Sequence, residues 1–155
     1  MNTNPRTFSS LIVGFIAGAL ATVTAHEAVI LLLQQHGFWV PRAPWSMEPI
    51  TSGPLAQFAI PQLVSAMFWG GIWGAIFALI WGSVPRGPLT FKGIVLGLLG
   101  PALIGVMVLV PLITAKFPVF FAGELDKIGP VAAILAAYGA VTGWLYGFMT
   151  SGCRM

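Results

Sequence analysis

The sequence predicts an all-α, polytopic membrane protein, folded as an antiparallel bundle of four transmembrane helices in a single domain. Three observations predict this class. Only 7% of the 155 residues are charged and 57% are hydrophobic, and the mean hydropathy of +0.92 is too high for the surface of a soluble domain. Four stretches have about the 20 apolar residues that a helix needs to cross a bilayer. In all four, small residues recur at every fourth position, which is typical of helices that pack closely in lipid.

The four predicted spans cover residues 8–33, 58–82, 93–113 and 130–150. The first needs a check, because a charged start at Arg6 and the small residues around Ala25 also resemble a signal peptide. The apolar character resumes from Ala28 to Leu33, which makes the run long enough to cross a bilayer. We therefore expect a first transmembrane helix.

The link between the first two spans, residues 37–56, is rich in proline. Its prolines prevent a long helix, and Trp39 and Trp45 suit the headgroup region of a bilayer. We expect an ordered loop that rests on the membrane. The other two links are short, which favours antiparallel neighbours.

The basic residues that flank the spans predict an orientation. One side carries four of them, Arg6, Arg86, Lys92 and Arg154. The other side carries three, Arg42, Lys116 and Lys127. Because cytoplasmic loops carry the excess of Lys and Arg, both termini are expected in the cytoplasm. The proline-rich loop and the loop that contains Glu124 are then outside.

Each span carries a ridge of small residues along one helix face, which lets two backbones approach closely. The glycines expected at these contacts are Gly14, Gly18, Gly70, Gly74, Gly97, Gly139, Gly143 and Gly147. The first ridge continues through Thr22 to His26. We expect a tight bundle.

The second span also has an aromatic stripe at four-residue spacing, about 100° around the helix from its glycines. Its members are Trp69, Trp73, Phe77 and Trp81. Such a stripe is more often bulk filling than a cofactor site. It could face lipid, a membrane-protein partner or a second copy of the chain, and it predicts no pigment or quinone site.

A faint internal repeat links the two halves of the chain. The segment GFIAG at 14–18 is similar to GIVLG at 93–97, and WGGIWG at 69–74 is similar to YGAVTG at 138–143. One interpretation is a parallel repeat of two helical hairpins. The other is chance, because glycine-rich helices resemble one another.

His26 and Glu27 are the ionisable residues that lie well inside a span. An acid within the membrane is by default a candidate functional site, and a histidine beside it suits proton exchange or ligand binding. Neighbouring positions on a helix point about 100° apart, so the two are expected not to face each other, with His26 on the ridge. The alternative is structural: both hydrogen-bond to Gln62 and Ser65 of the second span and fix its register.

Several other function classes are excluded on composition. The formal net charge of +3 comes from seven basic and four acidic residues, which form no nucleic-acid-binding patch. A single cysteine, Cys153, cannot build a disulfide framework or a thiolate metal site. His26 and His36 lie about 15 Å apart along one helix, too far to ligate one haem iron. The membrane region lacks a catalytic set, so we expect no enzyme, no cofactor and no metal.

Three segments carry a resemblance to known proteins: GFIAGALATVTAHEA, GFWVPRAPWSMEPI and IPQLVSAMFWGGIWGAIFALIWG. They look similar to a group of small, uncharacterised four-helix inner-membrane proteins of proteobacteria. The resemblance covers most of the chain and implies a bacterial inner-membrane location. It carries no known mechanism.

Two functions fit these observations. The first is a non-enzymatic membrane protein that serves assembly, as an accessory subunit or as a homo-oligomer. The alternative is a small transporter or channel in which His26, Glu27 and Gln62 form a polar or proton-exchanging site. Polar residues cluster near one interface instead of at several depths, which favours assembly.

Overall fold

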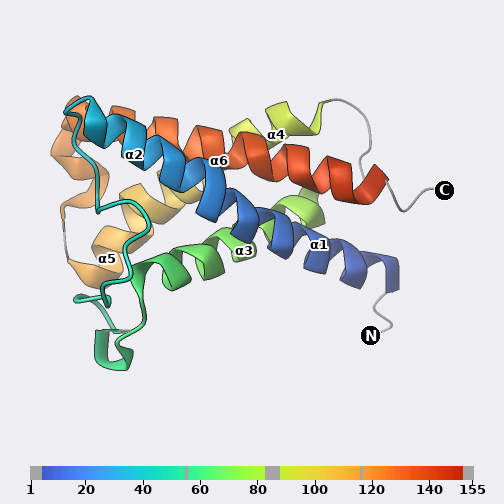
Figure 1. The fold of residues 1–155 in the computed structure, drawn as a ribbon, viewed down its shortest axis with the longest axis horizontal. Coiled ribbons are helices and arrows are strands. Elements are labelled where there is room, and N and C mark those ends of the chain that lie inside the picture. The colour runs from blue at the N-terminus through green and yellow to red at the C-terminus, as the bar shows by residue number, and fades with distance from the viewer. Residues whose placement is uncertain (1–4, 55, 83–87, 116, 152–155) are drawn as a thin grey trace.

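The computed structural model describes residues 5–54, 56–82, 88–115 and 117–151 (Figure 1). These residues form helices and loops without any strand, and four of the helices are long and apolar enough to cross a membrane. The prediction of an all-α chain with four candidate spans is confirmed. Those helices run over Phe8–Gln35, Gln62–Trp81, Leu89–Thr114 and Leu125–Ser151. Of the residues named above, Arg86, Lys116, Cys153 and Arg154 lie outside the described part.

The first span consists of three segments, which are α1 (Pro5–Ala21), the π-helical turn η1 (Thr22–His26) and α2 (Glu27–Gln35). The backbone N–H of Glu27 donates to the carbonyl of Thr22, five residues earlier, which is the hydrogen bond of a π-turn. Two threonine hydroxyls donate to carbonyls four residues earlier, Thr22 to Gly18 at 3.0 Å and Thr24 to Leu20 at 2.7 Å. Threonine bonds of this kind often bend helices.

The second span, α3 (Gln62–Trp81), begins four residues after the predicted start. Residues Ala56–Phe58 form a separate 3-10 turn, η2, and Ala59 has a left-handed backbone with φ of 48°. The helix therefore starts only after Pro61. Its first N–H groups are satisfied by the preceding loop, because Gln62 donates to the Glu48 carbonyl at 2.9 Å and Leu63 to the Ser46 carbonyl at 3.0 Å.

The third span repeats the composite design of the first. It runs through α4 (Leu89–Gly97), the π-helical η3 (Leu98–Leu109) and α5 (Val110–Thr114). Pro101 lies inside η3 and has no N–H to donate to the helix ladder. A short turn, η4 (Val119–Gly123), then leads to α6 (Leu125–Ser151).

The spans are arranged as two antiparallel hairpins, with α1 against α3 and α4 against α6 (Figure 1). At each contact, glycines face the backbone of the partner helix. A methyl group built on Gly18 would overlap the Gly70 carbonyl, and one on Gly14 would overlap the Gly74 carbonyl. These close approaches align glycine Cα–H groups with carbonyl oxygens, which is a weak stabilising contact that recurs between helices.

The second hairpin has the same kind of contact. A methyl group on Gly93 would overlap the Gly139 carbonyl, one on Gly97 that of Leu135, and one on Gly143 that of Leu89. Gly147 is less crowded, since its added carbon would lie 3.1 Å from the Leu89 side chain. All eight glycines expected at helix contacts thus lie at or beside one.

The two hairpins meet mainly where α1 packs on α6. The Tyr138 hydroxyl of α6 is buried and donates to the Gly70 carbonyl of α3 at 2.6 Å. Nearer the other end, the hydroxyls of Ser10 and Tyr146 are hydrogen-bonded. The fourth span is therefore central in the bundle and contacts both helices of the first hairpin.

Candidate functional site

The π-turn changes which residue of the first span faces the interior. Gly14, Gly18 and Thr22 are buried at four-residue spacing, and the next buried position on this face is Glu27, five residues on. The side chain of Glu27 is 0% exposed, whereas that of His26 is 17% exposed. The expectation that His26 continues the ridge and that Glu27 points away from it was wrong. The additional residue in the π-turn rotates the helix face by one position.

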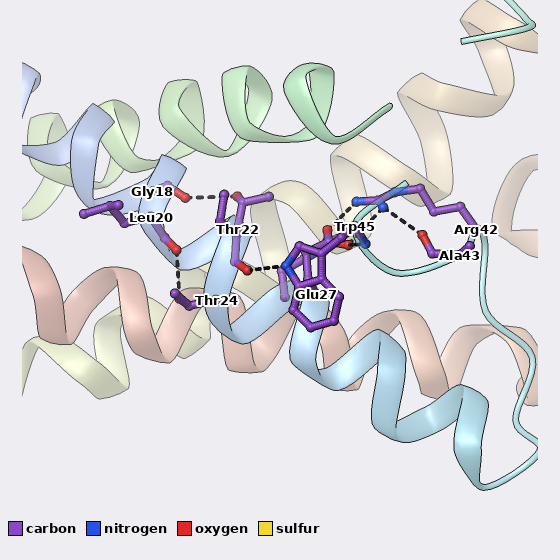
Figure 2. Close-up of polar contacts among 10 residues, drawn as sticks. Gly18, Leu20, Thr22, Thr24, Glu27, Arg42, Ala43 and Trp45 are labelled. Carbon is purple, nitrogen blue, oxygen red and sulfur yellow. Dashed lines mark hydrogen bonds and ion pairs between the residues drawn. The ribbon is translucent and has the colours of Figure 1, made fainter. Parts of the chain in front are cut away.

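Glu27 is held by Arg42 and Trp45, both from the proline-rich loop (Figure 2). The Arg42 guanidinium binds the carboxylate in a bidentate manner, with Nη1 donating to Oε2 at 3.0 Å and Nη2 donating to Oε1. The backbone N–H of Trp45 donates to Oε2 at 2.7 Å. Both carboxylate oxygens therefore accept hydrogen bonds from a segment outside the span.

His26 also reaches this carboxylate. Its Nδ1 lies 3.0 Å from Glu27 Oε1, so the expectation that the two side chains do not face each other was wrong as well. A π-helical turn has more residues per turn than an α-helix, so consecutive side chains lie closer in angle. The angle that applies to a regular α-helix therefore does not hold here.

The charge balance of the cluster explains why an acid is tolerated inside a span. A lone carboxylate in a low-dielectric interior is costly, and a bidentate arginine compensates it better than a lysine does. Arg42 is itself only 14% exposed in its side chain and also donates to the Ala43 carbonyl at 3.1 Å. The ion pair is thus largely removed from solvent on both sides, and both carboxylate oxygens accept hydrogen bonds.

Residues 37–54, which we call the strap, have further anchors on the first and second spans. The Trp45 indole Nε1 donates to the Val23 carbonyl at 3.0 Å. In a regular helix that carbonyl would accept from the Glu27 N–H, which here bonds to Thr22. The Trp45 indole of the strap therefore donates to a carbonyl that the π-turn leaves without its usual helical donor. The Ser46 and Glu48 carbonyls of the strap accept hydrogen bonds from backbone N–H groups at the start of α3.

The strap also contacts the loop before the fourth span. The Trp39 ring meets Phe121 edge-on, with 5.4 Å between ring centroids, and the Lys127 ammonium lies 5.9 Å from the Trp39 ring. Lys127 pairs in turn with Glu124 at 2.6 Å. The strap thus joins three parts of the bundle at the end opposite to the start of α1 (Figure 1).

Gln62 and Ser65, the expected partners of Glu27, are not the groups that bind it. The hydrogen bonds of Glu27 among the described residues go to His26, Arg42 and Trp45. Gln62 and Ser65 begin α3, and the backbone N–H of Ser65 donates to the Pro61 carbonyl at 3.0 Å. The sequence interpretation missed Arg42 and Trp45 as site residues. One signal was available: a lone arginine follows the span that contains a lone acid.

The aromatic stripe of the second span does not form one exposed face. Trp69 is 50% exposed, but Phe77 is fully buried. Trp73 packs over Gly100 of the third span, and Trp81 contacts the Phe77 ring. A four-residue spacing overshoots the 3.6-residue turn, so the stripe winds about 40° per step around the helix. Of the four rings, Trp69 is the most exposed.

An open apolar groove of about 740 Å³ lies on the surface beside the π-turn. It runs between the first span and α6, and Trp45 forms part of its wall. Its lining comprises Leu20, Val23, Thr24, Ala25, Ala28, Trp45, Val141, Trp144 and Leu145. The groove is open to the outside of the bundle.

The cluster around Glu27 is chemically suited to hold the strap. Its carboxylate is buried and fully engaged by donors, and no buried side-chain nitrogen or oxygen among the described residues lacks a partner. The geometry therefore favours fixing one conformation over offering a group to a substrate. Comparison of the chain with protein-family models, with curated proteins and with solved structures finds no match.

Proposed function

We propose that the protein is a non-enzymatic, multi-pass protein of the bacterial inner membrane that serves assembly, as an accessory subunit or as a homo-oligomer. Both termini are proposed to be cytoplasmic, with the strap and the Glu124 loop on the outer side. The proposal follows from the way the interior is filled, because the bundle has close helix contacts where a transport path would need space.

The observation that carries the proposal is the pair of glycine contacts along the bundle. In each hairpin, even one added methyl group would overlap a backbone carbonyl of the facing helix. Buried hydroxyls between the spans are used within the protein, as in Thr142, which donates to the Tyr138 carbonyl at 2.8 Å. Close glycine packing is how membrane helices associate in lipid, and in this bundle it occupies the space that a solute path would need.

The transporter alternative requires polar groups at several depths and space between them. Gln62 stands at the start of α3, near the strap, and Glu27 is bonded to Arg42. Neither placement supports a path that continues toward the other end of the bundle. The assembly role is therefore the better supported of the two.

Exposed apolar side chains support placement of the strap end of the molecule at the membrane–water interface. Phe38 and Met47 of the strap are 56% and 64% exposed, and Phe58 just after it is 63% exposed. Large apolar and aromatic side chains of this kind suit the boundary between headgroups and acyl chains. This placement agrees with a loop that rests on the membrane.

The test is purification of the tagged protein from its own membranes in mild detergent, with measurement of native mass and identification of co-purifying proteins. We expect either a partner in fixed stoichiometry or a homo-oligomer of defined size. A monomer without partner, together with solute or proton flux in liposomes that is lost in Glu27→Gln, would contradict the proposal and favour the transporter.

A further inference from the structure

We propose that the strap is a latched element, held closed by the Glu27 carboxylate, which opens as a unit while the four-helix bundle stays folded. This inference is independent of the assembly role. The bonds that hold the strap to the first span and the glycine contacts that join the helices lie at different residues.

The anchors of the strap on the first span converge on one side chain. The Glu27 carboxylate binds the Arg42 guanidinium and the Trp45 backbone N–H, which are three residues apart in the strap. The Trp45 indole bond to Val23 adds a third contact within the same turn of helix. Loss of the carboxylate charge therefore weakens the hold on both strap residues at once.

Trp45 is held in a conformation that favours release. Its φ of 47° lies in the left-handed region, where a bulky residue is strained. Such strain persists only where surrounding contacts impose it. Here those contacts are the backbone bond to Glu27 and the indole bond to Val23. Without the carboxylate, relaxation of Trp45 favours the open form.

The glycine contacts that join the helices of each hairpin do not involve the strap. The α1 and α3 helices meet at Gly14, Gly18, Gly70 and Gly74, and α4 meets α6 at its own glycines. Local opening of a loop without global unfolding is common, and the strap residues packed on the core, Trp39 and Val40, lie before Arg42 and Trp45 in the chain. Opening of the strap also withdraws Trp45 from the wall of the apolar groove.

Ser46 and Thr142 provide matched reporters for the two parts. Ser46, in the strap, is 8% exposed, and Thr142, in the centre of α6, is 1% exposed. Each is replaced separately by cysteine in a Cys153→Ser background, and the rate of maleimide labelling is measured on the full chain in detergent. Each reporter is combined separately with Glu27→Gln and with Glu48→Gln. Glu48→Gln is the control, because it removes an exposed carboxylate of the strap that does not bind Arg42 or Trp45.

We expect Glu27→Gln to speed the labelling of Ser46→Cys by about 10- to 100-fold, the range for loss of hydrogen bonds to a charged group. The labelling of Thr142→Cys should stay slow, and Glu48→Gln should leave both rates unchanged. Equal acceleration at both reporters would overturn the proposal, because Glu27 would then hold the whole fold. An unchanged rate at Ser46→Cys would overturn it too, because the strap would not depend on the carboxylate.

Discussion

The two hairpins use the same design in their first helices. The glycine pair Gly14 and Gly18 has its counterpart 79 positions later in Gly93 and Gly97, and both pairs pack on the backbone of the hairpin's second helix. The same offset places the π-turn Thr22–His26 inside the π-helical segment Leu98–Leu109. This correspondence supports the interpretation of the internal repeat as two related hairpins.

The hairpins differ in the side chains that their π-helical segments place in the interior. The first brings Glu27 to the interior, where Arg42 neutralises it, whereas the second contains only apolar residues and includes Pro101. The contact register also differs by about one helical turn, since Gly14 faces Gly74 while Gly93 faces Gly139, the counterpart of Gly70. Glycine packing is thus sufficient to form a hairpin, and the buried charge serves the strap.

The largest expected effect tests the part of the design that the hairpins share. Gly18→Leu and Gly139→Leu each force a side chain into a facing backbone, so we expect each to lower the free energy of unfolding by about 4 kcal/mol or more. The control is Gly129→Leu on α6, because a side chain there meets open space; it should change the free energy of unfolding by less than about 1 kcal/mol, since helix propensity favours leucine while Pro130 disfavours a side chain before it. Unfolding in mixed detergent micelles measures all three. Tolerance of leucine in one hairpin alone would break the proposed equivalence.

The next effect separates the hairpins, because it concerns the charge that only the first contains. Arg42→Gln leaves a buried carboxylate without its cation and should cost about 3 to 5 kcal/mol. Glu27→Gln leaves the Arg42 side chain, which is 14% exposed where Glu27 is 0% exposed, so we expect a smaller cost of about 1.5 to 3 kcal/mol. Glu124→Gln removes an exposed ion pair and should change stability by less than about 1 kcal/mol. The same unfolding assay decides the order, and a larger cost for Glu27→Gln than for Arg42→Gln would contradict the deeper burial of the carboxylate.

A smaller effect distinguishes the second helices of the hairpins. Tyr138 on α6 corresponds in the repeat to Trp69 on α3, but Tyr138 is buried and bonded to Gly70, whereas Trp69 is half exposed. Tyr138→Phe should therefore cost about 1 kcal/mol, the worth of one buried hydrogen bond, and Trp69→Phe should be nearly neutral. Thermal unfolding of the two variants measures this difference. Equal costs would mean that α6 is no more central than α3.

The smallest expected effect concerns the indole bond of the strap. Trp45→Phe keeps an aromatic ring but removes the donor to Val23, for an expected cost of about 0.5 to 1 kcal/mol. Trp144→Phe on α6 is the matched control, since Trp144 is exposed and stacks on Phe148. Strap accessibility to limited proteolysis should rise in the first variant and not in the second. A similar rise in both would show that the bond to Val23 does not secure the strap.

The apolar spans and the glycine contacts follow from local patterns, so the sequence was enough to predict them. Ridges at Gly14 and Gly18 or at Gly70 and Gly74 depend only on the period of a helix. The π-turn does not follow from such a pattern, and the groups that bind it, Arg42 and Trp45, come from the strap. The interior position of Glu27 was therefore mispredicted, and its partners lay beyond the reach of helix periodicity.

The ion pair between Glu27 and Arg42 couples the strap to the first span, and a double-mutant cycle measures this coupling. Unfolding free energies of the wild type, Glu27→Gln, Arg42→Gln and the double variant are needed under one set of conditions. We expect the double variant to be more stable than Arg42→Gln alone, with a coupling energy of at least about 1.5 kcal/mol, because removing both charges leaves neither unpaired. Additive costs would contradict a buried ion pair that latches the strap to the first span.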